Sequence, residues 1–176
     1  SIWTQPYNRG SRSRINGLGS DGFSFINTSD PQSEPGSGHV GAAMLALNTS
    51  GAQDIRVTWT GGTVVPNARD YGIRLQYRNG DSGSFTDVTD SAGNPVEYLR
   101  NANAGHSQII GPVTLPAAAN DQPLVQLRWK YYFRSGTSGA RPQLRVDDIQ
   151  VSIGHPAAHL VQVAEAPLVG QTGHPP

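Results

Sequence analysis

Residues 125–133 constrain the fold more than any other stretch of this sequence. Apolar and polar side chains alternate along them, which is the pattern of a β-strand with one buried face. Each large apolar side chain that is fully buried contributes roughly 1.5–3 kcal/mol, so we expect this strand to anchor the core. Its inward side chains are predicted to be Val125, Leu127, Trp129, Tyr131 and Phe133.

Shorter alternating stretches, such as residues 54–60 and 71–78, lie between turns rich in Gly and Pro. Gly61 and Gly62 predict a break or bulge in the strand before residues 63–65. Residues 42–48 fit either helix or strand, and their all-β surroundings favour strand. The sequence therefore predicts an all-β fold, an antiparallel two-sheet β-sandwich, with jelly roll as the first choice of topology and an immunoglobulin-like sandwich as the second. The predicted core contains Trp59, Leu75, Leu127, Trp129, Phe133, Val146 and Val151.

The alternating pattern ends near Gly154, where the composition changes. We expect a β-sandwich domain over residues 1–154 and an extended, Pro- and Gly-rich tail or linker over residues 155–176. The tail keeps one short alternating segment, which could add as a strand to the sheet edge of a neighbouring subunit. This predicted assembly strand consists of Leu160, Val161, Gln162, Val163 and Ala164.

The charge is balanced at 13 basic and 13 acidic residues, which removes the general electrostatic case for binding nucleic acid. No apolar run approaches the length that spans a membrane, so no membrane insertion is expected. The sequence has no Cys, and secreted bacterial β-domains often do without disulfides, whereas small animal ectodomains usually need them.

One motif looks catalytic. Gly80-Asp81-Ser82-Gly83 resembles the sequence around the nucleophile of chymotrypsin-like serine proteases. Such a serine needs a histidine as general base, and His39, the only histidine before it, has nothing of the protease pattern around it. We interpret the motif as a hairpin turn. Because neither paired carboxylates nor a nucleophile with its base can be assembled from the spacing, we expect no enzymatic activity.

The apolar phase of the last predicted strand, residues 143–153, changes at Asp147 and Asp148. This change predicts a bulge or an inward carboxylate. A buried carboxylate needs hydrogen bonds, an Arg or a hard cation, and residues 20–22 or 27–30 could supply further oxygen ligands for calcium. An Arg pairing and a structural calcium ion are both open, and the candidate calcium ligands are Asp147, Asp148 and Asp21.

Polar side chains occupy the outward positions of the strongest strands. If these strands are neighbours, the side chains form a cationic face that could bind acidic or neutral glycans. Arg134 and Arg145 also fall on outward positions of their strands and would belong to the same face. The alternative is a solvated face whose cations pair with Asp and Glu, which is ordinary in sandwiches. The candidate ligand face consists of Arg74, Gln76, Arg78, Arg128, Lys130 and Tyr132.

Several short segments together resemble a known group of domains: residues 59–62, 71–78, 85–88, 127–129 and 146–151. They are similar to a jelly-roll accessory domain of large secreted bacterial multidomain proteins, found beside lamin-tail, nuclease or immunoglobulin-like domains. The last segment is also similar to MAM domains and carbohydrate-binding modules. The resemblance implies an extracellular or cell-surface bacterial protein, and it marks no catalytic site.

Two functions follow as hypotheses. The first is a non-catalytic structural subunit of a cell-surface or extracellular assembly, a filament joined by strand addition of the C-terminal tail. The alternative is a carbohydrate-binding or adhesion module of a secreted multidomain protein. The expected partners are other copies of the chain or a neighbouring extracellular domain, and glycans.

Overall fold

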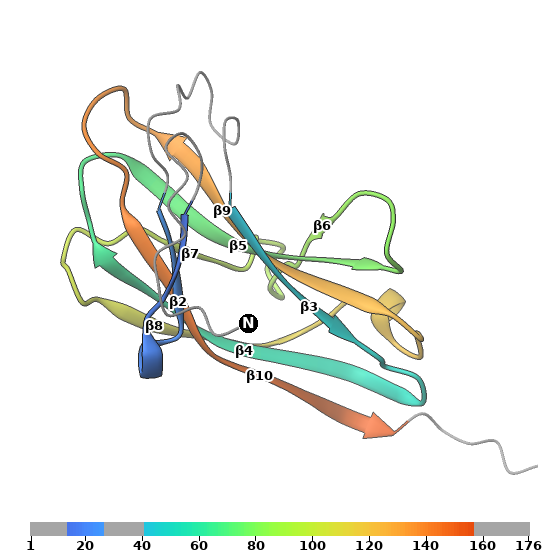
Figure 1. The fold of residues 1–176 in the computed structure, drawn as a ribbon. Helices are drawn as coiled ribbons and strands as arrows, with labels where there is room; N and C mark the ends of the chain where they lie inside the picture. The colour runs from blue at the N-terminus through green and yellow to red at the C-terminus, as the bar shows by residue number, and fades with distance from the viewer. Residues whose placement is uncertain (1–13, 27–40, 157–176) are drawn as a thin grey trace, which may run out of the picture.

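The computed structural model describes residues 14–26 and 41–156 (Figure 1). Two antiparallel sheets make up this part of the chain, and two short 3-10 turns, η1 (Gly19–Asp21) and η2 (Ala117–Ala119), lie between strands. The strands are β1 (Arg14–Gly17), β2 (Phe23–Ile26), β3 (Gly41–Leu47), β4 (Ala52–Val65), β5 (Asp70–Asn79), β6 (Thr86–Asp87), β7 (Glu97–Leu99), β8 (Ser107–Thr114), β9 (Val125–Ser135) and β10 (Gln143–Pro156).

The strand order identifies the topology. One sheet has the order β1-β2-β10-β4-β8, and the other has the order β3-β9-β5-β6, with β7 also paired to β5. Successive strands from β2 to β5, and again from β8 to β10, alternate between the sheets, which is the jelly-roll arrangement. The expected all-β antiparallel sandwich is therefore confirmed. No helix in the described ranges is long and apolar enough to cross a membrane.

The core lies between the sheets and is centred on β9, as its alternation predicts. Trp129 of β9 meets Trp59 of β4 edge to face, with ring centroids 6.4 Å apart, and Tyr131 stacks on Tyr71 at 4.7 Å. Six of the seven predicted core residues are buried, each with at most 4% of its surface exposed: Trp59, Leu75, Leu127, Trp129, Phe133 and Val146.

A bulge interrupts β10 at the position that the sequence indicates. The register with β4 shifts between Asp147 and Gln150, and Asp148 has a φ of 49°. A bulge of this kind adds a residue to one strand and bends it. Of the two explanations for the change of phase, the structure therefore shows the bulge.

Val151 is the exception among the predicted core residues, because it is 38% exposed and that prediction is wrong. Val151 and Ile153 pair with Val57 and Ile55, which are buried, so all four face the same side of the sheet. The pairing of β2 with β10 ends at Val146. Beyond that point no strand of the described residues pairs with the outer edge of β10, and Val151 and Ile153 are incompletely covered.

The glycine pair at positions 61 and 62 does not break the strand, although the sequence predicts a break or bulge there. β4 continues through both glycines with unshifted pairing to β10 and β8. A Cβ atom on Gly61 would lie 2.4 Å from the Cβ atom of Tyr98. The absence of a side chain thus makes room for Tyr98, whose hydroxyl group lies 2.8 Å from the hydroxyl group of Thr63.

The last strand extends two residues past the expected domain boundary at Gly154. His155 and Pro156 still pair with Gln53 and Ala52 of β4. Residues 157–176, which include the predicted assembly strand from Leu160 to Ala164, lie outside the described residues.

Candidate functional site

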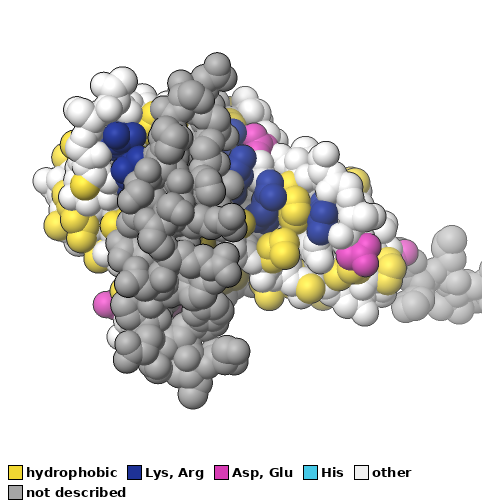
Figure 2. All heavy atoms as spheres, turned by 45° about the horizontal axis from the view of Figure 1, so that its top comes forward, with side chains coloured by type: hydrophobic (Ala, Val, Ile, Leu, Met, Phe, Trp, Pro, Cys, Tyr) yellow, Lys and Arg dark blue, Asp and Glu magenta, His cyan; other side chains and the backbone are white. Residues whose placement is uncertain are grey.

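The six predicted ligand-face residues lie together on the outer side of β5 and β9. These strands are hydrogen-bonded neighbours, with Arg74 opposite Lys130 and Gln76 opposite Arg128. Opposed residues of an antiparallel pair project to the same side. We call this surface the polar face and define it by Arg74, Gln76, Arg78, Arg128, Lys130 and Tyr132. Figure 2, which brings the top of Figure 1 forward, shows Lys and Arg side chains in dark blue across the visible surface.

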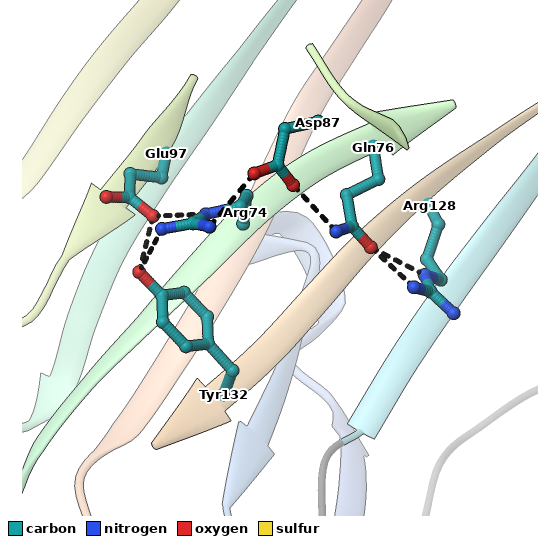
Figure 3. A network of polar contacts seen from close by, with 6 residues as sticks. All are labelled: Arg74, Gln76, Asp87, Glu97, Arg128 and Tyr132. Atoms are coloured by element: carbon teal, nitrogen blue, oxygen red, sulfur yellow. Dashed lines mark hydrogen bonds and ion pairs between the residues drawn. The ribbon is translucent and has the colours of Figure 1, made fainter. Parts of the chain in front are cut away.

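Arg74 is the centre of a hydrogen-bond network on the polar face (Figure 3). Its Nε donates to Glu97 Oε2 at 2.8 Å, one terminal nitrogen donates to Asp87 Oδ2 at 3.0 Å, and the other donates to the Tyr132 hydroxyl at 3.0 Å. Burial alone lowers the pKa of Arg74, but the hydrogen bond to Glu97 and the charges of Tyr132, Glu97 and Asp87 outweigh it and raise the pKa above its ordinary value. The three hydrogen bonds therefore hold the guanidinium group in one position, and the raised pKa keeps it positively charged.

Tyr132 extends this network and stays neutral. Its hydroxyl group donates to Glu97 Oε2, and its ring lies under Arg74, with the guanidinium carbon 4.8 Å from the ring centroid. Burial, followed by the hydrogen bond to Glu97 and the charge of that carboxylate, raises the pKa of Tyr132 to about 12. The phenol is therefore a hydrogen-bond donor over the whole neutral range.

Gln76 carries the network across to β9. Its side-chain nitrogen donates to Asp87 Oδ1 at 2.7 Å, and its side-chain oxygen accepts from Arg128 Nε at 3.0 Å (Figure 3). Only 8% of Gln76 is exposed. A buried amide of this kind needs its partners, so the Gln76 side chain is held between a carboxylate and a guanidinium group.

Phe85 supports the other end of the polar face. The guanidinium carbons of Arg78 and Arg128 lie 4.5 Å and 4.0 Å from its ring centroid. Arg78 also donates through Nε to Gln126 Oε1 at 2.8 Å. Burial, followed by the charge of Arg78, lowers the pKa of Arg128.

Lys130 differs from the cations around it. It is the single lysine of the sequence. No carboxylate of the described residues lies within ion-pair distance of it. The same holds for Arg78 and Arg128, but these two donate to the side-chain oxygens of Gln126 and Gln76. Burial, and then the charges of Arg128 and Arg74, lower the pKa of Lys130, and Asp87 opposes this only in part. The ammonium group is thus a partly buried positive charge without a negative partner in this part of the structure.

A cavity of about 480 Å³ opens beside Lys130. This volume is within the range of small-molecule sites, roughly 300–1,000 Å³. Two of its lining residues, Arg134 and Asp70, form an ion pair at 2.7 Å. The lining includes Asp70, Arg74, Gln76, Lys130, Tyr132 and Arg134, so cations outnumber carboxylates.

The acidic and aromatic partners of the face, Asp87, Glu97 and Phe85, were not assigned from the sequence. The turn after residue 78 indicates that residues 85–88 form a hairpin with β5, but nothing in the sequence shows that β7 also pairs with β5 and places Glu97 opposite Arg74. The grouping of Arg145 with this face is wrong, because it lies on β10 in the other sheet.

Arg145 instead pairs with the predicted calcium ligands. It donates to Asp147 Oδ2 at 3.3 Å and to the backbone carbonyl of Asp21 at 3.2 Å, while Asp147 Oδ1 accepts from the Asp148 amide at 2.8 Å. Within the ranges that the structure describes, no group of three or more His, Asp or Glu side chains could hold a metal ion. Calcium at this bulge stays a prediction, which calorimetric titration and a calcium-dependent melting temperature would check.

The protease-like motif lies in the exposed loop between β5 and β6. Ser82 is exposed and forms no hydrogen bond to a histidine in the described part of the chain. Gly80 and Gly83 have φ values of 76° and 83°, which are typical of tight turns.

Comparison with protein-family models, with curated proteins and with solved structures gave no match. The resemblance to secreted accessory domains and carbohydrate-binding modules therefore stays a prediction. The geometry of the polar face is the basis on which a function can be argued.

Proposed function

We propose that this protein is a non-catalytic extracellular binding module whose polar face holds an acidic carbohydrate. The observation that carries the proposal is Lys130, a cation without a carboxylate partner in the described structure, beside a cavity lined with hydrogen-bonding groups. A ligand carboxylate or sulfate group would supply the missing negative charge.

Electrostatics favour an acidic ligand over a neutral one. Arg74 and Arg134 already have carboxylate partners, whereas Lys130 lies between Arg74 and Arg128 and is repelled by both. An anion next to Lys130 would relieve this repulsion and raise the pKa of the ammonium group. A neutral glycan would form hydrogen bonds with the polar face but would not pair with the charge of Lys130.

The other groups of the cavity suit a polyhydroxylated molecule. The guanidinium groups, the Gln76 amide and the Tyr132 hydroxyl are held rigidly by one another, so little side-chain entropy is lost when they bind a ligand. A guanidinium group can contact two neighbouring oxygen atoms. Arg74 has five N–H groups and Gln76 has two, and the network uses three and one of them, so both residues keep donors for a ligand. A uronic acid, which combines hydroxyl groups with a carboxylate, matches both requirements.

The test measures binding of polygalacturonate, with dextran as the neutral polymer, by affinity electrophoresis and titration calorimetry. We expect the natural chain to bind polygalacturonate in low salt, and Lys130→Gln to weaken binding at least about tenfold, which corresponds to about 1.4 kcal/mol. Binding should weaken as salt is added, because the contact includes a partly exposed charge pair.

Two control variants make the test specific. Lys130→Arg keeps the charge and should bind within a few fold of the natural chain, and Arg56→Gln, an exposed position on β4 in the other sheet, should bind unchanged. Equal binding by Lys130→Gln, or no preference for the acidic polymer over dextran, would refute the proposal.

A further inference from the structure

In the described part of the chain, β3 and β10 have unpaired edges on one flank of the sandwich. β3 is the end strand of its sheet, and β9 is its one partner among the described residues. β10 pairs with β2 only from Leu144 to Val146, so its outer edge from Asp148 onward carries no strand among the described residues. Backbone N–H and C=O groups on such edges are open to pairing with another strand.

An apolar groove of about 290 Å³ lies between these two edges. Its lining includes Ala43 and Leu45 of β3 and Ile149 of β10, with Trp129 and Phe23 beside them. Along β10 the apolar face continues through Val151 and Ile153, which are 38% and 56% exposed. We call this surface the edge groove: Phe23, Ala43, Leu45, Trp129, Ile149, Val151 and Ile153.

Exposed apolar side chains and a free strand edge in the same place are an unfavourable combination for a solitary domain. Natural sheets protect their edges with charged side chains, proline or a covering segment, because an open apolar edge pairs with other chains. From the bulge to Ile153, the inward side of β10 carries Ile149, Val151 and Ile153. A strand laid along it would bury these side chains and pair the backbone.

We propose that the edge groove of one copy binds the segment from Leu160 to Ala164 of a second copy. The segment lies in the 20 residues that follow the end of β10 at Pro156. Its alternation lets Val161 and Val163 face the groove while Gln162 faces solvent, which is the pattern of a strand with one buried side. β-strand addition of this kind combines backbone hydrogen bonds with side-chain burial.

A second copy suits the segment better than the same chain does. To lie antiparallel on its own β10, the chain would have to reverse directly after Pro156, and Ala157, Ala158 and His159 include none of the Gly, Asn or Asp residues that tight hairpin turns favour. Each copy has one donor segment and one acceptor groove. Such a head-to-tail contact that does not close into a ring produces an open chain of subunits.

The segment between β2 and β3 fits the groove less well than residues 160–164 do. Residues 27–40, which join β2 to β3, contain two prolines and have Val40 as their only large apolar residue. The proposed assembly is also separate from glycan binding, because it uses the sheet edges, whereas the polar face is the outer surface of β5 and β9.

The test uses two full-length variants, one defective as donor and one as acceptor. Val161→Asp combined with Val163→Asp removes the donor face, and Ile153→Asp places a charge in the acceptor groove at a side chain that is 56% exposed. Sedimentation velocity should show concentration-dependent oligomers for the natural chain and monomers for each variant alone. An equimolar mixture of the variants should form heterodimers and nothing larger, since only one intact donor and one intact groove remain per pair.

Matched controls are Gln162→Asp in the donor and Ser152→Asp on β10, both on the opposite parity, and both should assemble like the natural chain. If Ile153→Asp does not fold, two single-cysteine variants replace it, one chain with Ile153→Cys and another with Val161→Cys. The sequence has no Cys of its own, so mixing the two variants under oxidising conditions should give a disulfide-linked heterodimer. A natural chain that is monomeric at every concentration, or mixed variants that remain monomers without a cross-link, would overturn the proposal.

Discussion

The polar face and the edge groove belong to the same sandwich but differ in whether their side chains and backbone groups have partners. On the polar face, side chains from β5, β6, β7 and β9 hold one another through Arg74, Asp87, Glu97 and Gln76. In the edge groove, apolar side chains and two strand edges have no covering strand among the described residues. Within the described ranges, the polar groups of the polar face satisfy one another except at Lys130, whereas the edge groove is uncovered along its length.

This contrast separates two ways in which a β-sandwich can bind. A rigid polar network offers a small ligand a few fixed contacts, so a single residue decides affinity. An open strand edge offers a long, repetitive contact in which backbone pairing supplies much of the affinity and alternate side chains supply specificity. Changes on the two surfaces should therefore have effects of different kind and size.

The largest expected effect distinguishes the closed core from the open flank. Leu127→Ala removes a completely buried side chain of β9 and should lower the free energy of unfolding by about 2–5 kcal/mol. Val151→Ala, at the partly exposed flank, should cost less than about 1 kcal/mol in the monomer. Urea unfolding of both variants at low protein concentration checks this, and equal losses would mean that the flank is as well packed as the core.

The behaviour of Val151 shows what the sequence can and cannot predict about the fold. Alternation in residues 125–133 is enough to predict the central strand, and the change of phase at Asp147 predicts a bulge or an inward carboxylate there, because both patterns depend on neighbours along the chain. Whether the inward side of a strand is covered depends on the strands across the sandwich. That β2 leaves β10 after Val146 is a property of the pairing and has no signature within residues 143–153.

The next largest effect is expected inside the polar network. Glu97→Gln removes the charge that Arg74 and Tyr132 share and should destabilise the fold by about 1–3 kcal/mol, since both partners are largely buried. Arg134→Gln breaks a more exposed ion pair with Asp70 and should cost less than about 1 kcal/mol. Thermal and urea unfolding compare the two, and a larger loss for Arg134→Gln would contradict the ranking.

The same network shows the limit of sequence reasoning for the site. The alternation of β5 and β9 placed the six polar residues on outward positions, and the structure brings them together because these strands are neighbours. The paired carboxylates Asp87 and Glu97 come from β6 and β7, which flank β5 on different parts of its length. Two short strands of two and three residues carry too little pattern to predict their pairing.

A smaller effect is expected at alkaline pH. The pKa of Tyr132 is raised to about 12 in the folded protein, compared with about 10 in an unfolded chain. Its stabilising contribution is therefore complete below about pH 10 and is lost as the pH rises towards 12. Tyr132→Phe should lose stability less steeply than the natural chain in that range, as measured by urea unfolding at stepwise pH. Identical slopes would show that the phenol does not stay protonated in the folded state.

The smallest expected change in stability is at Lys130, the cation on which the proposed ligand binding depends. The pKa of Lys130 is lowered in the folded protein, so at neutral pH the folded state holds a proton that it binds less tightly than the unfolded chain does. The natural chain should therefore gain a little stability as the pH rises through the lowered pKa towards the unfolded value. Lys130→Gln should lack this gain and, at neutral pH, should change the unfolding free energy by no more than about 0.5 kcal/mol.

Lys130→Met keeps the apolar stem of the side chain and separates its packing from its charge. If Lys130 binds a ligand and not a group of the protein, Lys130→Gln and Lys130→Met should both be as stable as the natural chain at neutral pH. Lys130→Gln should nevertheless lose polygalacturonate binding. A loss of more than about 1 kcal/mol in both variants would be typical of a structural ion pair. In that case the ammonium group would already have a partner within the protein, and the argument that a ligand supplies its negative charge would no longer hold.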